Sequence, residues 1–499
     1  MALKTLSIAD FSGGRNTKAT SFALRVNETL DQWSTWTENG ALVKRRGWSA
    51  ISSQILGVDN RILKMSLTNL GASGANRLVM MGRIGGTTAH ASYLAYTDNG
   101  TTISHCEATP TVFSGAAVPF MGMFRGKLYV SDGTNSAVSY DGTTVATVAN
   151  FPKYTKCAVH KNYIFAAKGS TVYWSDINDA TTWPTNNFQT VDSDVGDYIV
   201  ALYSWGGNLL IFKKRSMWML IGDVFDPIEA NYTIQRINTP ANFTFLSSQT
   251  IVPHMGVLKF LTVDGFYAYS GGNSVIKISD AIQPDIDTVD STGLQVLSTE
   301  ADTPDSFPKS FVWKNAMYCS VIVSGNRRII VQDERGKWWL FVDNSFAASP
   351  LEAVSCNLGS GEKLYGGMPG YSFFLTMDTG NSLTLPAPSN PAAINGYWIS
   401  KDFSFPAELM MRYAEIYLKK QTAVGGLGTL TLSFSIDGAT YVDKSVDMMN
   451  GTGTILKKRI PIERIGRSIK FKVANNEVGV TFEIYNISMV YEPTGATRS

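Results

Sequence analysis

Short apolar segments of strand length recur along the chain from about residue 60 to residue 385. Each is rich in β-branched or aromatic residues, and most are followed by a turn and a second segment of the same kind. This composition, bounded by turn residues, predicts β-strands. The first segments of the successive pairs are residues 77–81, 127–131, 163–167, 208–212, 257–261, 316–320 and 363–366.

The spacing of these segments indicates a repeat. Equivalent first segments follow one another at intervals of mostly about 35 to 55 residues. That period fits a propeller blade of about four strands, in which each blade buries its faces against its neighbours. We therefore predict an all-β protein with a β-propeller of six or seven blades over residues 56–385. Because the repeats are degenerate, a large irregular β-sandwich is the alternative.

The remainder of the chain is predicted to flank this propeller. Residues 1–55 are expected to form an extended N-terminal arm, and the proline-rich residues 386–396 a linker. Strands that alternate apolar and polar positions follow in residues 397–499, which predicts a C-terminal β-sandwich or jelly-roll-like domain. Helix signals are rare, and residues 282–300 are expected to form a short helix or an insertion at the rim of a blade.

Composition supports this organisation and limits the possible partners. A chain of 499 residues suggests two or three domains, and 44% hydrophobic with 17% charged residues indicates a globular protein. The net charge of +2 argues against a broad basic face that grips nucleic acid. The four cysteines form no CxxC pair, which is typical of a protein folded in a reducing cytoplasm. We expect neither a signal peptide nor a membrane-spanning segment.

The chain carries no common catalytic motif. Its four histidines have no zinc-site spacing, and neither a Gly-x-Ser-x-Gly elbow nor a phosphate-binding loop is present. Two acidic clusters could supply the carboxylates of a glycosidase or a calcium site, but solvated turns are the simpler interpretation. These clusters are Asp192, Asp194 and Asp197, and Asp285, Asp287 and Asp290. We predict no catalytic residue, no metal site, no cofactor and no enzymatic activity.

Three other features have a structural and a functional interpretation. Residues 435–441 resemble the Asp-box of sialidase propellers and are expected to form a hairpin turn. The basic triplets at residues 44–46, 213–215 and 457–459 are expected on solvated faces, with a neighbouring subunit or DNA as the alternative. The tryptophans are expected to pack between blades, with a sugar-stacking surface as the alternative; they include Trp174, Trp183, Trp205, Trp218, Trp338 and Trp339.

The beginning of the chain carries a family resemblance. Gly13-Gly14-Arg15-Asn16 is followed by Asn27-Glu28 and then by a Gly-x-Leu-x-x-Arg-x-Gly segment at residues 40–47. This order resembles the start of the β-propeller tail nozzle proteins, also called hub or stabilisation proteins, of short-tailed bacteriophages. A C-terminal β segment also follows the propeller in that family, so the resemblance covers most of the chain.

The resemblance implies a structural virion protein of the phage tail. In the family several copies, usually six, form a ring that extends the DNA exit channel below the portal and adaptor. The implied partners are further copies of the chain, the adaptor, tail fibre or needle proteins, and DNA in transit, with assembly in the host bacterial cytoplasm. We expect Arg15, Lys44, Arg45 and Arg46 at subunit interfaces because they lie in the shared motif.

Two other functional classes remain as alternatives. A receptor- or carbohydrate-binding propeller would expose tryptophans on its loops. A glycan-hydrolysing propeller would bring two acids together at its axis. A tail component of long-tailed phages is a further alternative, because the opening motif is not specific to short tails.

Overall fold

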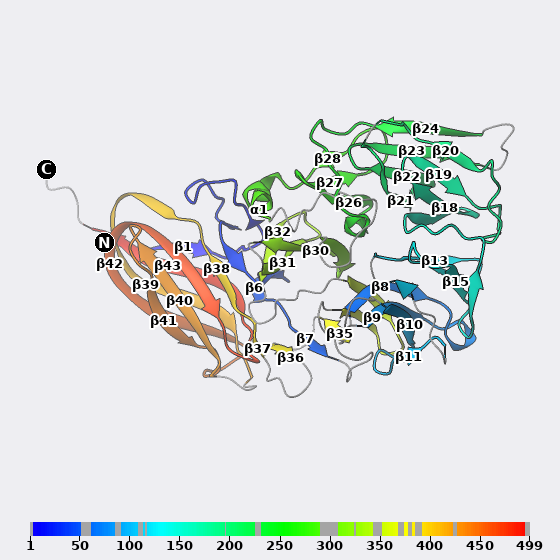
Figure 1. The fold of residues 1–499 in the computed structure, drawn as a ribbon. Coiled ribbons are helices and arrows are strands. Elements are labelled where there is room, and N and C mark those ends of the chain that lie inside the picture. The colour runs from blue at the N-terminus through cyan, green and yellow to red at the C-terminus, as the bar shows by residue number, and fades with distance from the viewer. Residues whose placement is uncertain are drawn as a thin grey trace.

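The computed structural model describes most of the chain. The described residues are 3–50, 61–84, 91–107, 113–114, 117–194, 196–224, 231–289, 308–323, 326–342, 352–367, 374–377, 382–384, 392–422 and 427–494. They fold into a ring of β-sheets and a second, curled sheet beside it (Figure 1). The prediction of an all-β propeller with an N-terminal extension and a C-terminal β unit is confirmed.

Six sheets of the ring are built from strands that are consecutive in the chain. The first contains β8 (Arg61–Thr68), β9 (Arg77–Ile84), β10 (Ala91–Thr97), β11 (Ser104–His105) and β12 (Phe113–Ser114). The second contains β13 (Phe120–Phe124), β14 (Lys127–Ser131), β15 (Ala137–Tyr140) and β16 (Val145–Val148). The third contains β17 (Cys157–His160), β18 (Tyr163–Lys168), β19 (Thr171–Trp174) and β20 (Phe188–Thr190).

The next three blades follow the same plan. The fourth contains β21 (Ile199–Trp205), β22 (Asn208–Lys213), β23 (Met217–Gly222) and β24 (Tyr232–Ile237). The fifth contains β25 (Val252–His254), β26 (Val257–Thr262), β27 (Gly265–Tyr269) and β28 (Ile276–Lys277). The sixth contains β29 (Lys309–Trp313), β30 (Ala316–Val323), β31 (Asn326–Gln332) and β32 (Trp338–Val342).

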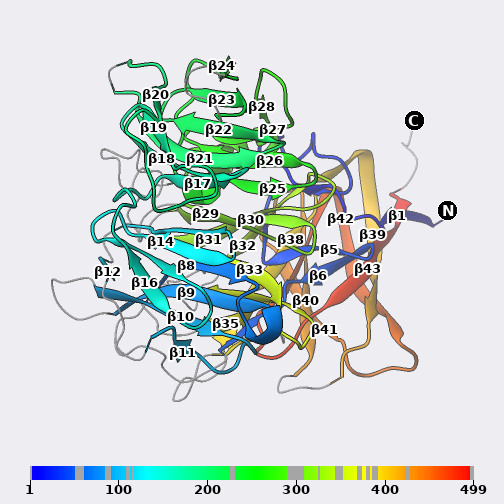
Figure 2. The same cartoon turned by 90° about the vertical axis from the view of Figure 1, so that its right-hand side faces the viewer.

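A composite seventh sheet closes the ring. It joins β33 (Glu352–Asn357), β34 (Glu362–Gly367), β35 (Phe374–Met377), β36 (Ser382–Thr384) and β37 (Ala392–Ala393) to the N-terminal strand β7 (Trp48–Ala50). β7 pairs antiparallel with β35, with Trp48 opposite Met377, and parallel with β36. The first strand of this sheet, β33, contacts both β29 and β8, so that the last blade touches the first (Figure 2).

The second unit is a single ten-stranded sheet that curls nearly closed. Its long strands β39 (Phe403–Lys419) and β42 (Ile455–Asn475) pair with each other, and β43 (Glu483–Pro493) lies on the other side of β39. β38 (Gly396–Ile399) and the hairpin of β40 (Thr429–Ile436) and β41 (Val442–Asp447) complete its C-terminal part. The curvature encloses one core, which includes Ile416, Leu432, Phe471 and Ile487.

The N-terminal residues belong to both units. β1 (Lys4–Ile8), β4 (Gln32–Trp33), β5 (Thr35–Glu38) and β6 (Ala41–Lys44) add strands to the curled sheet, before β7 enters the propeller. The short strands β2 (Gly14–Arg15) and β3 (Glu28–Thr29) pair with each other. The segment expected as an arm therefore runs between the two units (Figure 1).

Helices are short and few among the described residues. They are α1 (Gln283–Asp287) and the 3-10 turns η1 (Ala72–Gly74), η2 (Ser248–Thr250) and η3 (Asp280–Ile282). The expected short helix after residue 282 is thus present, while residues 290–300 and the proline-rich residues 385–391 lie outside the described part. No helix in the described ranges has the length and apolar character needed to cross a membrane.

Two side-chain predictions are confirmed. All eleven tryptophans are described and none is exposed: Trp174, Trp338 and Trp339 are buried, and Trp183, Trp205 and Trp218 are half-buried. The Asp-box-like segment forms the β40–β41 turn, where Asp437 and Gly438 both have positive φ. The Asp437 carboxylate accepts hydrogen bonds from the backbone N–H groups of Arg467 and Ser468 on β42, which fixes the turn on the sheet.

Candidate functional site

Arg15 joins the N-terminal segment to the propeller. Its Nε and Nη2 donate to the two carboxylate oxygens of Asp285 on α1, both at 2.8 Å. Nη1 donates to Asp31 Oδ1 at 3.1 Å. The Thr17 hydroxyl also donates to Asp285 Oδ2, at 3.2 Å, and the Thr17 backbone N–H donates to Ala281 O at 2.9 Å. A planar guanidinium suits this two-pronged contact, because its parallel N–H groups match a carboxylate.

Asp31 extends this contact to the second unit. Its other oxygen, Oδ2, accepts a hydrogen bond of 2.8 Å from the hydroxyl of Tyr397 on β38. Burial and the negative charge of Asp31 both raise the pKa of Tyr397, so the phenol stays protonated and donates. Burial lowers the pKa of Arg15, but hydrogen bonds and charges from Asp285 and Asp31 outweigh it and leave the pKa raised. We call Arg15, Asp31, Asp285 and Tyr397 the clamp.

The glycines before Arg15 allow the chain to pass close to blade six. Gly14 has φ +73°, and a Cβ there would lie 2.9 Å from Trp338 O and from Lys337 Cβ. A Cβ on Gly13 would lie 2.6 Å from Asn27 O. The chain can therefore follow this path only with glycine at positions 13 and 14. Gly47 is not among the positive-φ glycines, so its backbone conformation does not require glycine.

Lys44 is a buried lysine on β6. Its Nζ donates to Asn475 Oδ1 at 2.5 Å and to Val480 O at 2.7 Å, both in the C-terminal unit. Gly396 provides the room, since a Cβ there would lie 2.9 Å from Lys44 Cγ. Burial, together with the positive charge of Arg45, lowers the pKa of Lys44 to about 7, although Glu477 partly opposes this.

The lowered pKa of Lys44 predicts that stability increases with pH. Between about pH 7 and the ordinary lysine pKa of about 10.5, the unfolded chain holds a proton that the folded chain lacks. Raising the pH across this window should therefore stabilise the wild type more than Lys44→Met, which cannot titrate. Denaturant unfolding of both proteins at several pH values measures the difference. Parallel stability curves for the two proteins would contradict the assigned titration.

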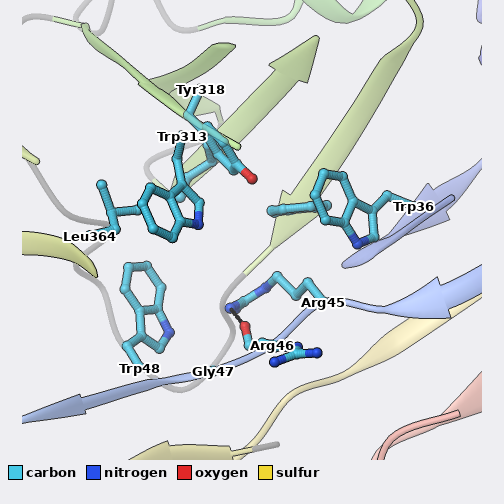
Figure 3. A pocket seen from close by; sticks show the side chains of 10 residues that line it. Trp36, Arg45, Arg46, Gly47, Trp48, Trp313, Tyr318 and Leu364 are labelled. Atoms are coloured by element: carbon cyan, nitrogen blue, oxygen red, sulfur yellow. Dashed lines mark hydrogen bonds between the residues drawn. The ribbon is translucent and has the colours of Figure 1, made fainter. Parts of the chain in front are cut away.

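Arg45 lies in an aromatic recess between the N-terminal segment and the last two blades (Figure 3). Its guanidinium carbon lies 5.3 Å from the ring centre of Trp48 and 5.9 Å from that of Phe341. Nη1 donates to Arg46 O at 3.2 Å, and Nε donates to the Ser34 hydroxyl at 3.3 Å. The remaining cavity is about 40 Å³, room for a water molecule but not for a larger ligand. The recess is therefore a packed contact between the N-terminal segment and the last two blades.

The four residues expected at subunit interfaces thus divide into two groups. Arg15, Lys44 and Arg45 bind groups within the chain, and their side chains are largely covered. Arg46 is exposed. Contact of these residues with another subunit stays a prediction, and Arg46 is the member whose side chain is available for it. The sequence reasoning missed Asp31, Tyr397 and Trp48, because their partners are distant in the chain.

Two members of the acidic clusters, Asp197 and Asp285, have hydrogen-bond partners within the chain. Asp197 accepts hydrogen bonds of 2.6 Å from the Arg215 backbone N–H and the Ser216 hydroxyl. Asp285 belongs to the clamp, and Asp290 lies outside the described ranges. Across those ranges, no group of three or more histidine, cysteine or acidic side chains is placed to hold a metal ion.

The other basic triplets also have partners within the chain. Lys213 is buried, and its Nζ donates to the carbonyls of Val191 and Asp192. Lys457 and Arg459 both pair with Glu415 on the outer face of β39 and β42. The triplet at residues 457–459 thus lies on a solvated face as predicted, whereas the expectation is wrong for Lys213, which is a buried residue of the fourth blade.

Comparison with known proteins adds no functional assignment. No family model and no curated protein matches the sequence. Among solved structures, a streptogramin B lyase is 11% identical with a TM-score of 0.41, covering 66% of this chain and 97% of its own. BBS1N in complex with ARL6DN is 12% identical with a TM-score of 0.41, covering 69% and 99%. The N-terminal domain of Nup159 is 8% identical with a TM-score of 0.38, covering 67% and 94%. At such values the likeness carries no activity or partner to this chain.

Proposed function

We propose that this protein is a structural subunit of a phage tail, of the nozzle or hub type, which assembles into a ring around the DNA exit path. The observation that carries the proposal is the structural role of the opening motif. Among the residues that resemble the nozzle family, Gly14, Arg15 and Arg45 contact the propeller, while residues 41–44 form β6 of the curled sheet.

A fixed connection between the propeller and the curled sheet would suit a subunit that bears mechanical load. The clamp connects α1 of the propeller with β38 of the second unit through the N-terminal segment. Hydrogen bonds from Ser34 N to Leu340 O and from Arg45 N to Ser34 O, both 2.8 Å, continue the connection at blade six. A ring subunit must keep its two contact surfaces at a fixed angle, because a heterologous interface closes only if the rotation between copies is constant.

The assembly state tests the proposal directly. The purified chain, of 54.5 kDa, should form a closed ring, or a monomer that becomes a ring when a portal–adaptor assembly is added. Mass measurement in solution followed by imaging distinguishes these states. A monomer that ignores the portal–adaptor assembly and binds a glycan array would favour the receptor-binding alternative and contradict the nozzle.

Arg46 gives a residue-level test of the same proposal. Because its side chain is exposed, Arg46→Glu should change the stability of the fold by no more than about 0.5 kcal/mol. It should nevertheless reduce ring formation at least tenfold if Arg46 meets a neighbouring copy. Arg25→Glu, at another exposed arginine of the N-terminal segment, is the matched control. Equal ring formation by the two variants would show that Arg46 does not lie at the interface between copies.

The carbohydrate-binding alternative has less structural support. Sugar recognition by stacking needs aromatic faces that solvent can reach, and no tryptophan of this chain is exposed. A glycan-hydrolysing site would need two carboxylates across a cleft. A cavity of about 400 Å³, where the first strands of the blades meet, has no carboxylate among its described lining residues.

A further inference from the structure

Two buried polar side chains from distant parts of the chain meet inside the curled sheet. Lys44 on β6 is 2% exposed, and Asn475 at the end of β42 is 4% exposed. The Lys44 Nζ atom lies 2.5 Å from Asn475 Oδ1, below the usual range of about 2.7–3.2 Å for a hydrogen bond between nitrogen and oxygen. The amide carbon Cγ lies at most one C=O bond, about 1.2 Å, beyond that oxygen. The amine and the amide carbon are therefore within reach of each other.

The hydrogen bonds of Lys44 match a neutral amine. Among the described residues its Nζ has two acceptors, Asn475 Oδ1 and Val480 O, the latter at 2.7 Å. An ammonium group has three N–H donors, whereas a neutral amine has two and a lone pair. Because burial lowers the pKa of Lys44 to about 7, a large share of the amine is neutral near neutral pH. A desolvated, neutral lysine is a nucleophile.

The Asn475 amide is held in one orientation. Its Nδ2 donates to Thr429 O at 2.7 Å, which leaves Oδ1 facing Lys44. Gly396, opposite Asn475 in the β38–β42 ladder, makes room for the Lys44 side chain. Turning Nζ about the Cε–Nζ bond exchanges an N–H group for the lone pair, so the amine can meet Cγ without movement of either strand. Such fixed proximity strongly raises the rate of reaction between two groups.

Glu477 provides a carboxylate close to this pair. It accepts hydrogen bonds from Gly428 N at 2.9 Å and from the backbone N–H and hydroxyl of Thr429, the residue that also binds Asn475. Its negative charge acts on Lys44, where it partly opposes the lowering of the pKa. A carboxylate near an amine and an amide can take a proton from the attacking nitrogen and pass it to the leaving nitrogen.

We propose that Lys44 and Asn475 form an intramolecular amide bond in the folded protein. The bond between Lys44 Nζ and Asn475 Cγ forms, and the bond between Cγ and Nδ2 breaks. The proton that Nζ gives up is carried by Glu477 to Nδ2, which leaves as ammonia. Atoms and electrons balance without an oxidant, a reductant or another reactant. The product joins β6 to β42 across 431 positions of the chain. This inference is independent of the proposed ring assembly.

The reaction follows folding, because residues so distant in the chain meet only in the folded sheet. Freshly folded chains therefore have the free amine whose titration affects stability. Chains that have reacted have no amine to titrate and should lose that pH dependence. Burial of the pair also protects the product from hydrolysis, since water has little access to it.

Mass spectrometry of the intact, full-length protein tests the proposal. On incubation the mass of the wild type should fall by one ammonia molecule. Tryptic digestion should then release a branched peptide that joins the segments around Lys44 and Asn475, which excludes asparagine cyclisation elsewhere, for example at Asn39-Gly40. Lys44→Met and Asn475→Ala should keep their mass and yield no branched peptide. The wild-type rate should rise with pH up to about 7 and change little above it, because the amine is then already neutral.

Lys259 provides the matched control. This buried lysine also donates to a side-chain amide, Gln332 Oε1 at 2.6 Å, but its other partner is the ring nitrogen Nδ1 of His254. Burial lowers the pKa of Lys259 only to about 8, so it keeps more of its charge near neutral pH. Lys259→Met should therefore lose ammonia like the wild type.

A second set of variants tests the proton transfer. Glu477→Gln keeps the size of the side chain and still accepts hydrogen bonds, but it should slow the loss of ammonia at least tenfold. Glu477→Asp should restore part of the rate. An unchanged rate in Glu477→Gln would contradict the role of this carboxylate.

The wild type decides the main question. An unchanged mass after prolonged incubation would overturn the proposal, as would a loss of ammonia that persists in Lys44→Met. If Lys44→Met does not fold, the branched peptide still decides: its presence in the wild type supports the bond between Lys44 and Asn475, and its absence refutes it.

Discussion

Replacing Arg15 with leucine is expected to lower the free energy of unfolding by about 2–3 kcal/mol, because the arginine is largely buried while the carboxylates of Asp285 and Asp31 are partly solvated. The Arg15 side chain is 10% exposed, and its removal leaves the carboxylates of Asp285 and Asp31 without their shared cation. Equilibrium denaturation in urea measures the loss. Arg25→Leu, at an exposed arginine of the same segment, should change stability by at most about 0.5 kcal/mol.

A double-mutant cycle separates the ion pair from simple loss of packing. Asp285→Asn keeps the shape of the side chain and removes its charge. In the Arg15→Leu background, Asp285→Asn should cost less than in the wild type, or even stabilise, because no cation remains to be balanced. Strictly additive losses would show that the Arg15–Asp285 contact contributes no coupling, which would contradict the clamp.

Gly14→Ala is expected to destabilise the protein by about 2–4 kcal/mol, combining the strain of a left-handed alanine with a steric clash. The clash is with the backbone of blade six, since the added Cβ would lie 2.9 Å from Trp338 O. Thermal or urea unfolding of the purified variant gives the value.

Gly40 provides the matched control for this substitution. It has φ +80°, close to that of Gly14, but a Cβ there would meet nothing within 4 Å. Gly40→Ala should therefore cost about 1–2 kcal/mol, from backbone strain alone. Equal losses at the two glycines would mean that the close approach to Trp338 has no energetic consequence.

The sequence predicts the parts of this fold that depend on local pattern. The strands at residues 127–131, 163–167 and 208–212 are recognisable because their apolar positions and turns are contiguous in the chain. The turn at Asp437 is recognisable for the same reason. Each of these features depends on residues within about ten positions of one another.

The pattern of apolar and polar residues could not specify contacts between residues that are distant in the chain. Asp285 was considered with its acidic neighbours Asp287 and Asp290, yet its partner is Arg15, 270 residues earlier. Lys213 belongs to a basic triplet that has the composition of a solvated turn, but its ammonium is bound by the carbonyls of Val191 and Asp192, which directly follow β20.

The placement of β7 has a consequence for the order of folding. Residues 48–50 complete a sheet whose other strands lie more than 300 residues later, at 352–393. During synthesis the N-terminal strand must remain unpaired until almost the whole propeller has left the ribosome. Its exposed edge is then open to pairing with other chains. Closure of the ring is consequently a late, high-contact-order step, and its rate should limit the yield of native protein.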